Sequence, residues 1–411
     1  MERAILVTVD LKSENGWSIE DRASELRELV WSSGVLRDTE ILCTRERPTP
    51  DLFIGKGKFE EIARLCREKN IDVVIFNNDL SPTQLRNLER GLNGVKVIDR
   101  TQLILDIFAQ HAYSEEGKIQ VELAQLEYLL PRLTGRGIHL SRLGGGIGTR
   151  GPGEKILEYN KRRIKSRISK LKLELKELEN RRHALRKRRK DAMLISIAIV
   201  GYTNAGKTTL LNKLTNSNRL TADRLFTTLD PVSRMYILPN NLKVLFHDTV
   251  GFLYNLPHHL IEAFKATLEE VKEADLLLHV LDGSNPRMHD LDSAVYSVLK
   301  ELKAEDKPIL TVVNKIDLID NLDYLTRIKR DFKDGVFISA LHGSGIDFLI
   351  DNILKILSGL VVEVKVKIGF NEMDKLNFIY EHGKIIKRET RGEHIYIEAI
   401  IPARLKPYFE K

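Results

Sequence analysis

The residues of this chain best suited to chemistry form a glycine-rich run that ends in a lysine and two threonines. Residues 201–209 read Gly-Tyr-Thr-Asn-Ala-Gly-Lys-Thr-Thr, between an apolar strand-like run and a helix-like segment. That setting is the one a phosphate-binding loop requires. Glycines let backbone N–H groups turn toward phosphates, Lys207 can reach the β and γ phosphates, and the hydroxyl of Thr208 can ligate Mg²⁺. The run therefore predicts nucleoside triphosphate binding and leaves the base undefined.

A second apolar run begins at Val244 and ends at a carboxylate, Asp248, and Gly251 follows three residues later. We expect Asp248 to help hold the magnesium shell and the N–H of Gly251 to meet the γ phosphate. A third run, Ile309–Asp317, supplies the base reader. The carboxylate of Asp317 can accept both the ring N–H and the exocyclic amine of guanine, and adenine offers no such donor pair.

A fourth segment, Phe337–Ala340, fits the strand end whose backbone completes a guanine pocket. Each segment alone is common, since Asn-Lys-x-Asp and Asp-Thr-Val-Gly also occur in ordinary loops and strand exits. All four follow one another at the carboxyl ends of apolar strands, where open α/β sheets bind their ligands. Together they predict a GTP-binding domain.

The catalytic residues we expect are Lys207, Thr228 and Gly251. The magnesium ligands we expect are Thr208, Thr228 and Asp248. The nucleotide contacts we expect are Gly201, Tyr202, Thr203, Asn204, Ala205, Gly206, Lys207, Thr208, Thr209, Phe226, Thr227, Thr228, Asp248, Thr249, Val250, Gly251, Asn314, Lys315, Asp317, Ser339 and Ala340.

The segment 225–231 supplies the mobile threonine that should close over Mg²⁺ and the γ phosphate, with Thr228 preferred and Thr227 as the alternative. Closing on GTP and opening after hydrolysis would be an order–disorder switch. In Ras-like GTPases a glutamine follows Asp-x-x-Gly and orients the attacking water, but here that residue is Phe252. We expect slow intrinsic turnover unless a partner, another side chain or a cation completes the site; alternatively Phe252 simply packs there and water is oriented elsewhere.

Asn204 offers one route to such a cation. Cation-stimulated GTPases carry an asparagine at this loop position, and its amide oxygen helps to hold K⁺. The alternative is that Asn204 occupies a tolerant loop position.

The length of 411 residues predicts two or three domains. We expect an α/β protein with an N-terminal α/β domain (1–110), a helical hairpin (111–192) with a glycine-rich loop (134–153), a P-loop G domain with a mostly parallel sheet and flanking helices (193–358), and a small C-terminal α/β appendage (359–411).

The apolar runs are too short to span a membrane. Cys43 and Cys66 lie outside any Cys-x-x-Cys spacing, so no disulfide or zinc site is indicated, and a cytoplasmic location is expected.

The net charge of +7 is distributed very unevenly. Residues 132–190 hold 20 lysines and arginines against 5 glutamates, a net of +15, which leaves −8 for the rest of the chain. The loop 134–153 has eight glycines and no acidic residue, and its three arginines are Arg136, Arg142 and Arg150. Backbone that permits close approach together with unopposed positive charge favours contact with RNA phosphates; the alternative is a spacer with a solvated charged surface.

Apolar residues on both sides of that loop predict a helical hairpin with a buried seam. The first helix would contribute Val121, Leu123, Leu126, Leu130 and Leu133. The second would contribute Leu157, Ile164, Ile168, Leu171, Leu175, Leu178 and Leu185. In the N-terminal domain the stretch Gly55–Lys58 is a weak candidate for a second anion site, and a glycine turn with solvated lysines is the favoured interpretation.

The chain resembles the HflX family of ribosome-associated GTPases over essentially its first 358 residues. The most specific motifs are the loop Gly144–Glu154, the switch segment Phe226–Pro231 and Asp248–Phe252 with the residues that follow it. Lys155 with Ile156, where the family commonly has Thr-Gln, and Thr227, where Ala is usual, are small departures. The resemblance implies binding to the large ribosomal subunit and its rRNA, and a role in splitting stalled or idle ribosomes. It also implies that ATP could be used through the N-terminal region, with Gly55–Lys58 as the local candidate.

Two other functions stay open at this point. One is an RNA-remodelling enzyme in which the N-terminal domain uses ATP and the G domain regulates it. The other is a membrane- or tRNA-modification GTPase that dimerises through its G domain, whereas we expect a monomer.

Overall fold

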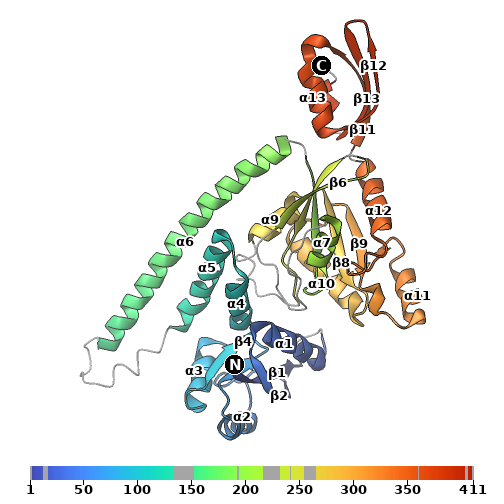
Figure 1. Cartoon of the computed structure of the whole chain (residues 1–411). Coiled ribbons are helices and arrows are strands. Elements are labelled where there is room, and N and C mark those ends of the chain that lie inside the picture. The colour runs from blue at the N-terminus through green and yellow to red at the C-terminus, as the bar shows by residue number, and fades with distance from the viewer. Residues whose placement is uncertain are drawn as a thin grey trace. The chain divides into compact units, whose positions relative to one another are not determined.

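The structure, a computed structural model, describes residues 2–12, 17–133, 152–191, 194–215, 232–240, 242–253, 265–359, 361–402 and 406–409. These residues form two compact units, one up to Leu178 and the other from Glu179 onward. Three separate sheets with their helices confirm the predicted α/β fold class (Figure 1). None of the described helices is both long enough and apolar enough to cross a membrane.

The N-terminal sheet has four parallel strands in the order β2-β1-β3-β4. Its strands are β1 (Arg3–Leu11), β2 (Leu36–Arg45), β3 (Val73–Phe76) and β4 (Lys96–Asp99). Its helices are α1 (Ile19–Ser33), α2 (Lys56–Lys69), α3 (Pro82–Gly91) and α4 (Arg100–His111). These elements agree with the α/β character predicted for this part of the chain. They form because apolar residues of β1 and β3 are buried against the amphipathic faces of the helices.

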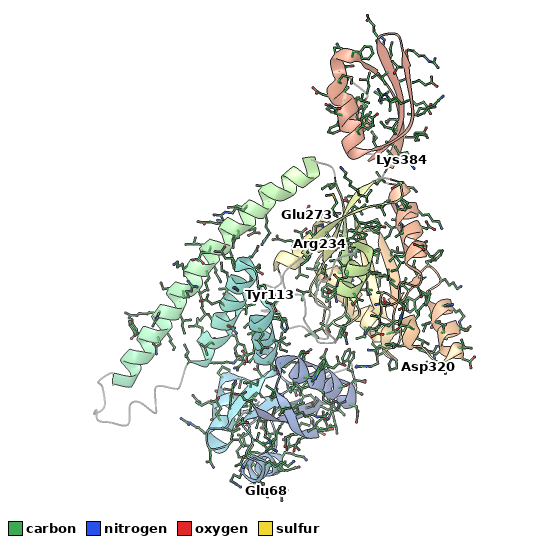
Figure 2. The ribbon with its side chains drawn as sticks, in the orientation of Figure 1. Glu68, Tyr113, Arg234, Glu273, Asp320 and Lys384 are labelled. Atoms are coloured by element: carbon green, nitrogen blue, oxygen red, sulfur yellow. The ribbon has the colours of Figure 1, made fainter. Side chains whose placement is uncertain are left out.

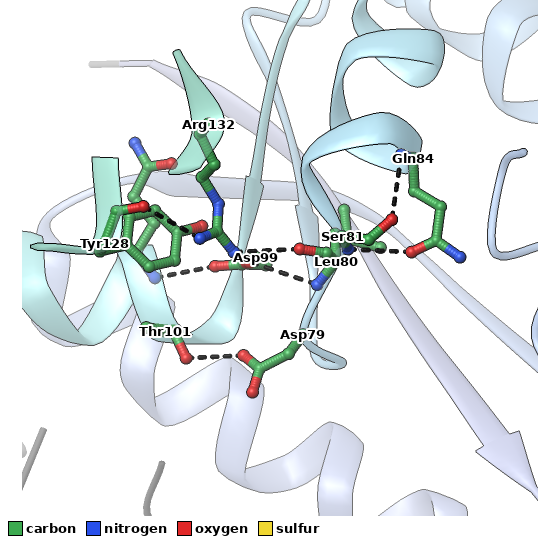
Figure 3. A network of polar contacts seen from close by, with 9 residues as sticks. Asp79, Leu80, Ser81, Gln84, Asp99, Thr101, Tyr128 and Arg132 are labelled. Carbon is green, nitrogen blue, oxygen red and sulfur yellow. Dashed lines mark hydrogen bonds and ion pairs between the residues drawn. The ribbon is translucent and has the colours of Figure 1, made fainter. Parts of the chain in front are cut away.

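A buried carboxylate ties this sheet to the next helix, α5 (Glu115–Arg132) (Figure 3). Asp99, at the end of β4, accepts the N–H groups of Gln102 at 2.9 Å and Leu80 at 3.2 Å. Arg132 Nη2 also donates to it at 3.2 Å, and the guanidinium carbon lies 3.4 Å from the centroid of the Tyr128 ring. Burial raises the pKa of Asp99, while these donors favour its charged form. Arg132 is therefore anchored just before the glycine-rich loop.

The hairpin consists of α5 and α6 (Pro152–Asp191). Helix α5 begins after Ser114, whose side chain caps the helix by accepting the N–H of Gly117. The predicted seam is present: Leu123, Leu126 and Leu130 pack with Ile164, Ile168, Leu171, Leu175 and Leu178. Val121 is buried outside that cluster, and Leu133, which the sequence placed in the seam, is not part of it. The side chains of Leu157 and Leu185 lie outside the described part of the chain.

The G-domain sheet has six strands in the order β10-β9-β8-β5-β7-β6. Its parallel strands are β5 (Ile195–Gly201), β7 (Lys243–Asp248), β8 (Leu276–Asp282), β9 (Ile309–Asn314) and β10 (Val336–Phe337), and β6 (Val232–Ile237) runs antiparallel at the edge. The helices are α7 (Lys207–Thr215), α9 (Lys265–Glu273), α10 (Met288–Glu301), α11 (Leu322–Asp331) and α12 (Ile346–Ser358), with the short 3₁₀ helix η2 (Ile316–Leu318). The parallel strands place their carboxyl ends at one edge.

The C-terminal residues form a three-stranded antiparallel sheet in the order β11-β13-β12. The elements are β11 (Val361–Gly369), η3 (Phe370–Glu372), α13 (Met373–His382), β12 (Lys384–Arg391), β13 (His394–Pro402) and α14 (Lys406–Phe409). Strand β12 was not foreseen from the sequence, because it is an edge strand rich in charged residues.

Candidate nucleotide-binding site

The glycine-rich run forms a turn between β5 and α7, as its sequence predicts. Gly206 has φ +92°, and a Cβ there would lie 2.2 Å from Asn314 Nδ2. Only glycine satisfies both constraints. Asn204 also has positive φ, at +60°, and its side chain is exposed. The backbone of this turn therefore curls tightly at the carboxyl end of β5.

Lys207, the first residue of α7, folds back over the turn. Its Nζ donates to the carbonyl oxygens of Gly201 at 3.1 Å and Tyr202 at 2.7 Å. Burial lowers the pKa of Lys207 to about 8, with the nearby charge of Lys315 acting in the same direction and that of Asp248 opposing it. Among the described residues the Lys207 ammonium donates to two neutral carbonyl oxygens, and a buried cation in that setting is well placed to be stabilised by an anion.

Two oxygen ligands suited to a hard cation lie next to the lysine. Thr208 Oγ1 donates to Asp248 Oδ2 over 2.8 Å, and Asp248 is fully buried at the end of β7. Thr249 Oγ1 donates to the carbonyl of Ile199 at 2.7 Å, which ties the end of β7 to β5. The hydroxyl and the carboxylate are ligands of the type that Mg²⁺ prefers.

Gly251 and Phe252 pack directly against the turn. A Cβ on Gly251 would lie 2.7 Å from the Cα of Thr203, so the close approach requires glycine. The N–H of Thr203 donates to the Phe252 carbonyl at 2.9 Å, and the N–H of Phe252 donates to the Gly201 carbonyl at 3.1 Å. The ring of Phe252 is buried. Phe252 therefore packs in the site, as one of the two interpretations expected, while the origin of water orientation stays a prediction.

Asn314 joins the glycine-rich turn to the segment that follows β10. Its Nδ2 donates to the Ala205 carbonyl at 2.9 Å, and its Oδ1 accepts the N–H of Ala340 at 2.9 Å. Ser339, beside Ala340, is buried, and its hydroxyl accepts the N–H of His342. Three segments that are distant in sequence thus meet at one edge of the sheet.

The segment predicted to contact the base makes two further contacts. Lys315 has φ +62°, and its Nζ donates to Asp282 Oδ2 at 2.7 Å. Asp317 lies in η2, with its Oδ2 at 3.7 Å from His342 Nε2. Asp282 was missed from the sequence, although it ends the apolar run of β8 at the same sheet edge as the other site residues. His342 was also missed, because it belongs to no recognisable motif.

Several candidate residues lie outside the described part of the chain. These are Phe226, Thr227 and Thr228 of the switch segment and Arg136, Arg142 and Arg150 of the glycine-rich loop. In the N-terminal domain Gly55 precedes α2, and Lys58 Nζ lies 2.8 Å from Glu61 Oε2. That pairing fits the favoured interpretation of Gly55–Lys58 as a glycine turn with surface lysines.

Four family profiles match the chain in sequence order. They are described as GTP-binding GTPase N-terminal (residues 20–109), GTP-binding GTPase Middle Region (111–189), 50S ribosome-binding GTPase (196–315) and HflX C-terminal domain (325–398). The third profile spans the phosphate-binding turn, Asp248, Gly251 and Asn314.

Relatives named GTPase HflX match nearly the whole chain. The one from Lacrimispora saccharolytica is 46% identical over 404 residues, covering 98% of this chain and 94% of the relative. The one from Escherichia coli is 44% identical over 365 residues, covering 88% and 84%. A GTP-binding protein from Sulfolobus solfataricus, solved in complex with GDP, is 27% identical and covers 88% of this chain and all of its own, with a TM-score of 0.45.

Proposed function

This chain belongs to the HflX family of GTPases and hydrolyses GTP, and we propose that it does so as a monomeric, cytoplasmic switch on the large ribosomal subunit. In this proposal GTP-bound protein contacts rRNA through the hairpin, takes part in splitting or rescuing stalled or idle ribosomes, and is stimulated by the ribosome to hydrolyse GTP.

The observation that carries the proposal is the cationic surface of α6. Its exposed residues include Arg163, Lys165, Lys176 and Arg181, on a helix that follows the arginine-containing loop. Phosphate contacts with lysine and arginine supply most of the affinity of nucleic-acid binding without reading sequence. The profile description of the G domain as a 50S ribosome-binding GTPase supports the same partner.

Within the nucleotide site we assign roles from the geometry. Lys207 would neutralise the β and γ phosphates, the N–H of Gly251 would orient the γ phosphate, and Asp317 would accept the two guanine donors. Thr208 and Asp248 fit Mg²⁺, with Thr228 closing over it. When bound, Mg²⁺ would neutralise charge that develops on the phosphate oxygens.

The ribosomal proposal is tested with purified ribosomes. The full-length chain should co-sediment with the large subunit in the presence of a non-hydrolysable GTP analogue and less with GDP, and should shift intact ribosomes toward free subunits in a sucrose gradient. Equal binding to the large subunit with the analogue, with GDP and without nucleotide would contradict the switch proposal.

A charge-reversal variant tests the hairpin assignment. Replacing Arg136, Arg142 and Arg150 with Glu should weaken co-sedimentation and leave GDP affinity unchanged, because the nucleotide contacts lie on other elements. A matched control reverses three exposed cations of α11, Arg327, Lys329 and Arg330. Equal losses in both variants would mean that general positive charge, and not the loop, binds the ribosome.

The proposal for K⁺ concerns Asn204. Its exposed position on the phosphate-binding turn supports a role in holding a monovalent cation that offsets the absence of a glutamine at Phe252. GTP hydrolysis should be faster in K⁺ than in Na⁺ at matched ionic strength, and Asn204→Ala should remove the difference. Equal rates in the two salts with the unmodified chain would refute this role.

A further inference from the structure

Asp282, the last residue of β8, divides its two carboxylate oxygens between two neighbours. Its Oδ1 accepts the N–H of Ser284 at 3.0 Å and the hydroxyl of the same residue at 2.6 Å. Its Oδ2 accepts from Lys315 Nζ at 2.7 Å. The first oxygen shapes the turn after β8, which is a common task for an aspartate at the end of a strand. The second oxygen binds the lysine of the segment predicted to contact the base, and the turn does not require that bond.

The turn after β8 lies directly against the segment that contains Lys315. In the parallel register of β8 and β9, Asp282 lies opposite Asn314. The N–H of Gly283 donates to the Asn314 carbonyl at 2.8 Å, and a Cβ on Gly283 would lie 2.8 Å from Val313 Cγ1. Only a residue without a side chain allows so close an approach. The backbone on both sides therefore fixes the position of Asp282 relative to Lys315.

Lys315 has an unusual backbone for a residue other than glycine, with φ +62°. Such a left-handed backbone persists where surrounding contacts hold it in place. The side chains of Lys315 and Asp282 are 23% and 17% exposed, so their ion pair is largely withdrawn from water. If the carboxylate were removed, the ammonium would be stabilised by any other acceptor within its reach.

Such an acceptor stands two residues further along the chain. Asp317, the proposed acceptor for the two guanine donors, lies in η2. Asp320, which Figure 2 labels, is an exposed carboxylate between η2 and α11 and marks the end of this segment. A lysine ammonium on its flexible four-carbon stem pairs readily with a nearby carboxylate. An ammonium released from Asp282 would compete with guanine for Asp317, because both offer N–H donors to the same oxygens.

We propose that Asp282 is a positioning residue that determines the specificity of the site for guanine. It binds the Lys315 ammonium and so keeps the Asp317 carboxylate available for the ring N–H and the exocyclic amine of the base. This inference rests on the proposed role of Asp317 as the base reader. It adds a residue that acts through Lys315 and need not touch the nucleotide.

The test compares the affinities of the full-length chain for GDP and for inosine diphosphate, which lacks the exocyclic amine. With Mg²⁺ present, calorimetric titration of the unmodified chain should show a preference for GDP of at least about tenfold, because the amine donates to a charged acceptor. In Asp282→Asn the two Ser284 donors keep the amide oxygen on their side, so the N–H₂ group faces Lys315 and releases it. This variant should lower the preference to about threefold or less, and Asp317→Ala should lower it to about one.

A second background identifies the route by which Asp282 acts. Lys315→Met keeps most of the apolar stem and removes the ammonium, so adding Asp282→Asn to it should cause no further loss of the preference for GDP. A further loss would show that Asp282 acts by another route and would overturn the proposal. The matched control is Asp320→Asn, which removes an exposed carboxylate from the same segment and should keep the preference of the unmodified chain.

The outcomes separate this inference from the base reader on which it builds. If the unmodified chain shows no preference for GDP, or if Asp317→Ala keeps that preference, the proposed base reader is wrong and the inference falls with it. If Asp317→Ala loses the preference and Asp282→Asn keeps it, the base reader stands and the role of Asp282 is wrong. Equal losses of affinity for both nucleotides in Asp282→Asn, with an unchanged ratio, would mean a purely structural role and would also overturn the proposal.

Discussion

Gly206 shows how one residue can serve two parts of the nucleotide site. The sequence explains it as a residue that lets backbone N–H groups approach phosphate. The structure adds a second reason, because Asn314, which links Ala205 to Ala340, occupies the space where a side chain would lie. The glycine thus leaves room for the side chain that ties the glycine-rich turn to the segment after β10.

We predict that Gly206→Ala loses affinity for both GTP and GDP by roughly thirtyfold or more. The methyl group would displace Asn314 and leave buried polar groups of Ala205 and Ala340 without their bonds, at a cost of about 2 kcal/mol. Titration with a fluorescent GDP analogue measures the change. Gly57→Ala is the matched control, since a Cβ there meets nothing within 4 Å. Equal affinities of the two variants would show that the space around Gly206 adapts.

Lys207 should make nucleotide affinity dependent on pH. Burial lowers its pKa to about 8, and phosphate binds the protonated form. The protonated fraction falls as pH rises through that value, so affinity for GDP should fall about fourfold between pH 7 and pH 8.5. Calorimetric titration checks this. In Lys207→Arg the guanidinium stays charged, and the affinity of that variant, whatever its level, should be constant over the interval.

At the scale of elements, β8 and α10 pack around a pair of titratable groups that the site does not use. His279 of β8 is buried, with Nδ1 3.4 Å from Asp292 Oδ1 of α10 and its ring edge-to-face with Tyr296. Burial and the charge of Lys207 lower the pKa of His279 to about 3. Burial raises the pKa of Asp292 to about 6. The apolar pattern of β8 predicted the strand but not this pairing.

These two shifts should act on stability with opposite sign. Between about pH 6.5 and 3 the unfolded chain binds a proton at His279 that the folded chain does not, so this group lowers stability as pH falls. Between about pH 6 and 3.8 the folded chain binds the proton at Asp292, so that group raises stability as pH falls. On acidification from pH 6 to pH 4, the free energy of unfolding of Asp292→Asn should fall, relative to that of the unmodified chain, by up to about 1.4 kcal/mol per pH unit.

His279→Leu should show the reverse trend over the same interval, gaining stability relative to the unmodified chain. The measurement is urea unfolding at each pH, following the transition that GDP shifts, because that transition belongs to the G domain. Parallel pH profiles for both variants and the unmodified protein would show that neither group titrates between these values.

At the scale of the whole molecule, the GTPase site and a strongly basic helix belong to one chain. The domain limits near residues 110, 192 and 358 stay predictions, while the two compact units divide within α6 itself, between Leu178 and Glu179. Coupling of two binding events is reciprocal by thermodynamic necessity.

We therefore predict that the nucleotide and the large subunit change each other's affinity for the protein by the same factor. If the GTP analogue tightens binding to the large subunit by some factor relative to GDP, the large subunit must favour the analogue over GDP by the same factor, about tenfold for a typical coupling. Nucleotide affinity with and without saturating subunits, together with subunit affinity in each nucleotide state, closes the cycle. Different factors would reveal a second binding mode.

Sequence alone predicted an α/β fold, the tight glycine-rich turn between β5 and α7, and membership of the GTPase family. These depend on residues that are close together in the chain, and parallel strands then bring their carboxyl ends to one edge. Tertiary structure alone decided which distant side chains meet: Asn314 with Ala205, Lys315 with Asp282, Arg182 with Glu269 and Asp99 with Arg132. Such contacts depend on how helices and sheets pack, and no spacing along the chain encodes that packing.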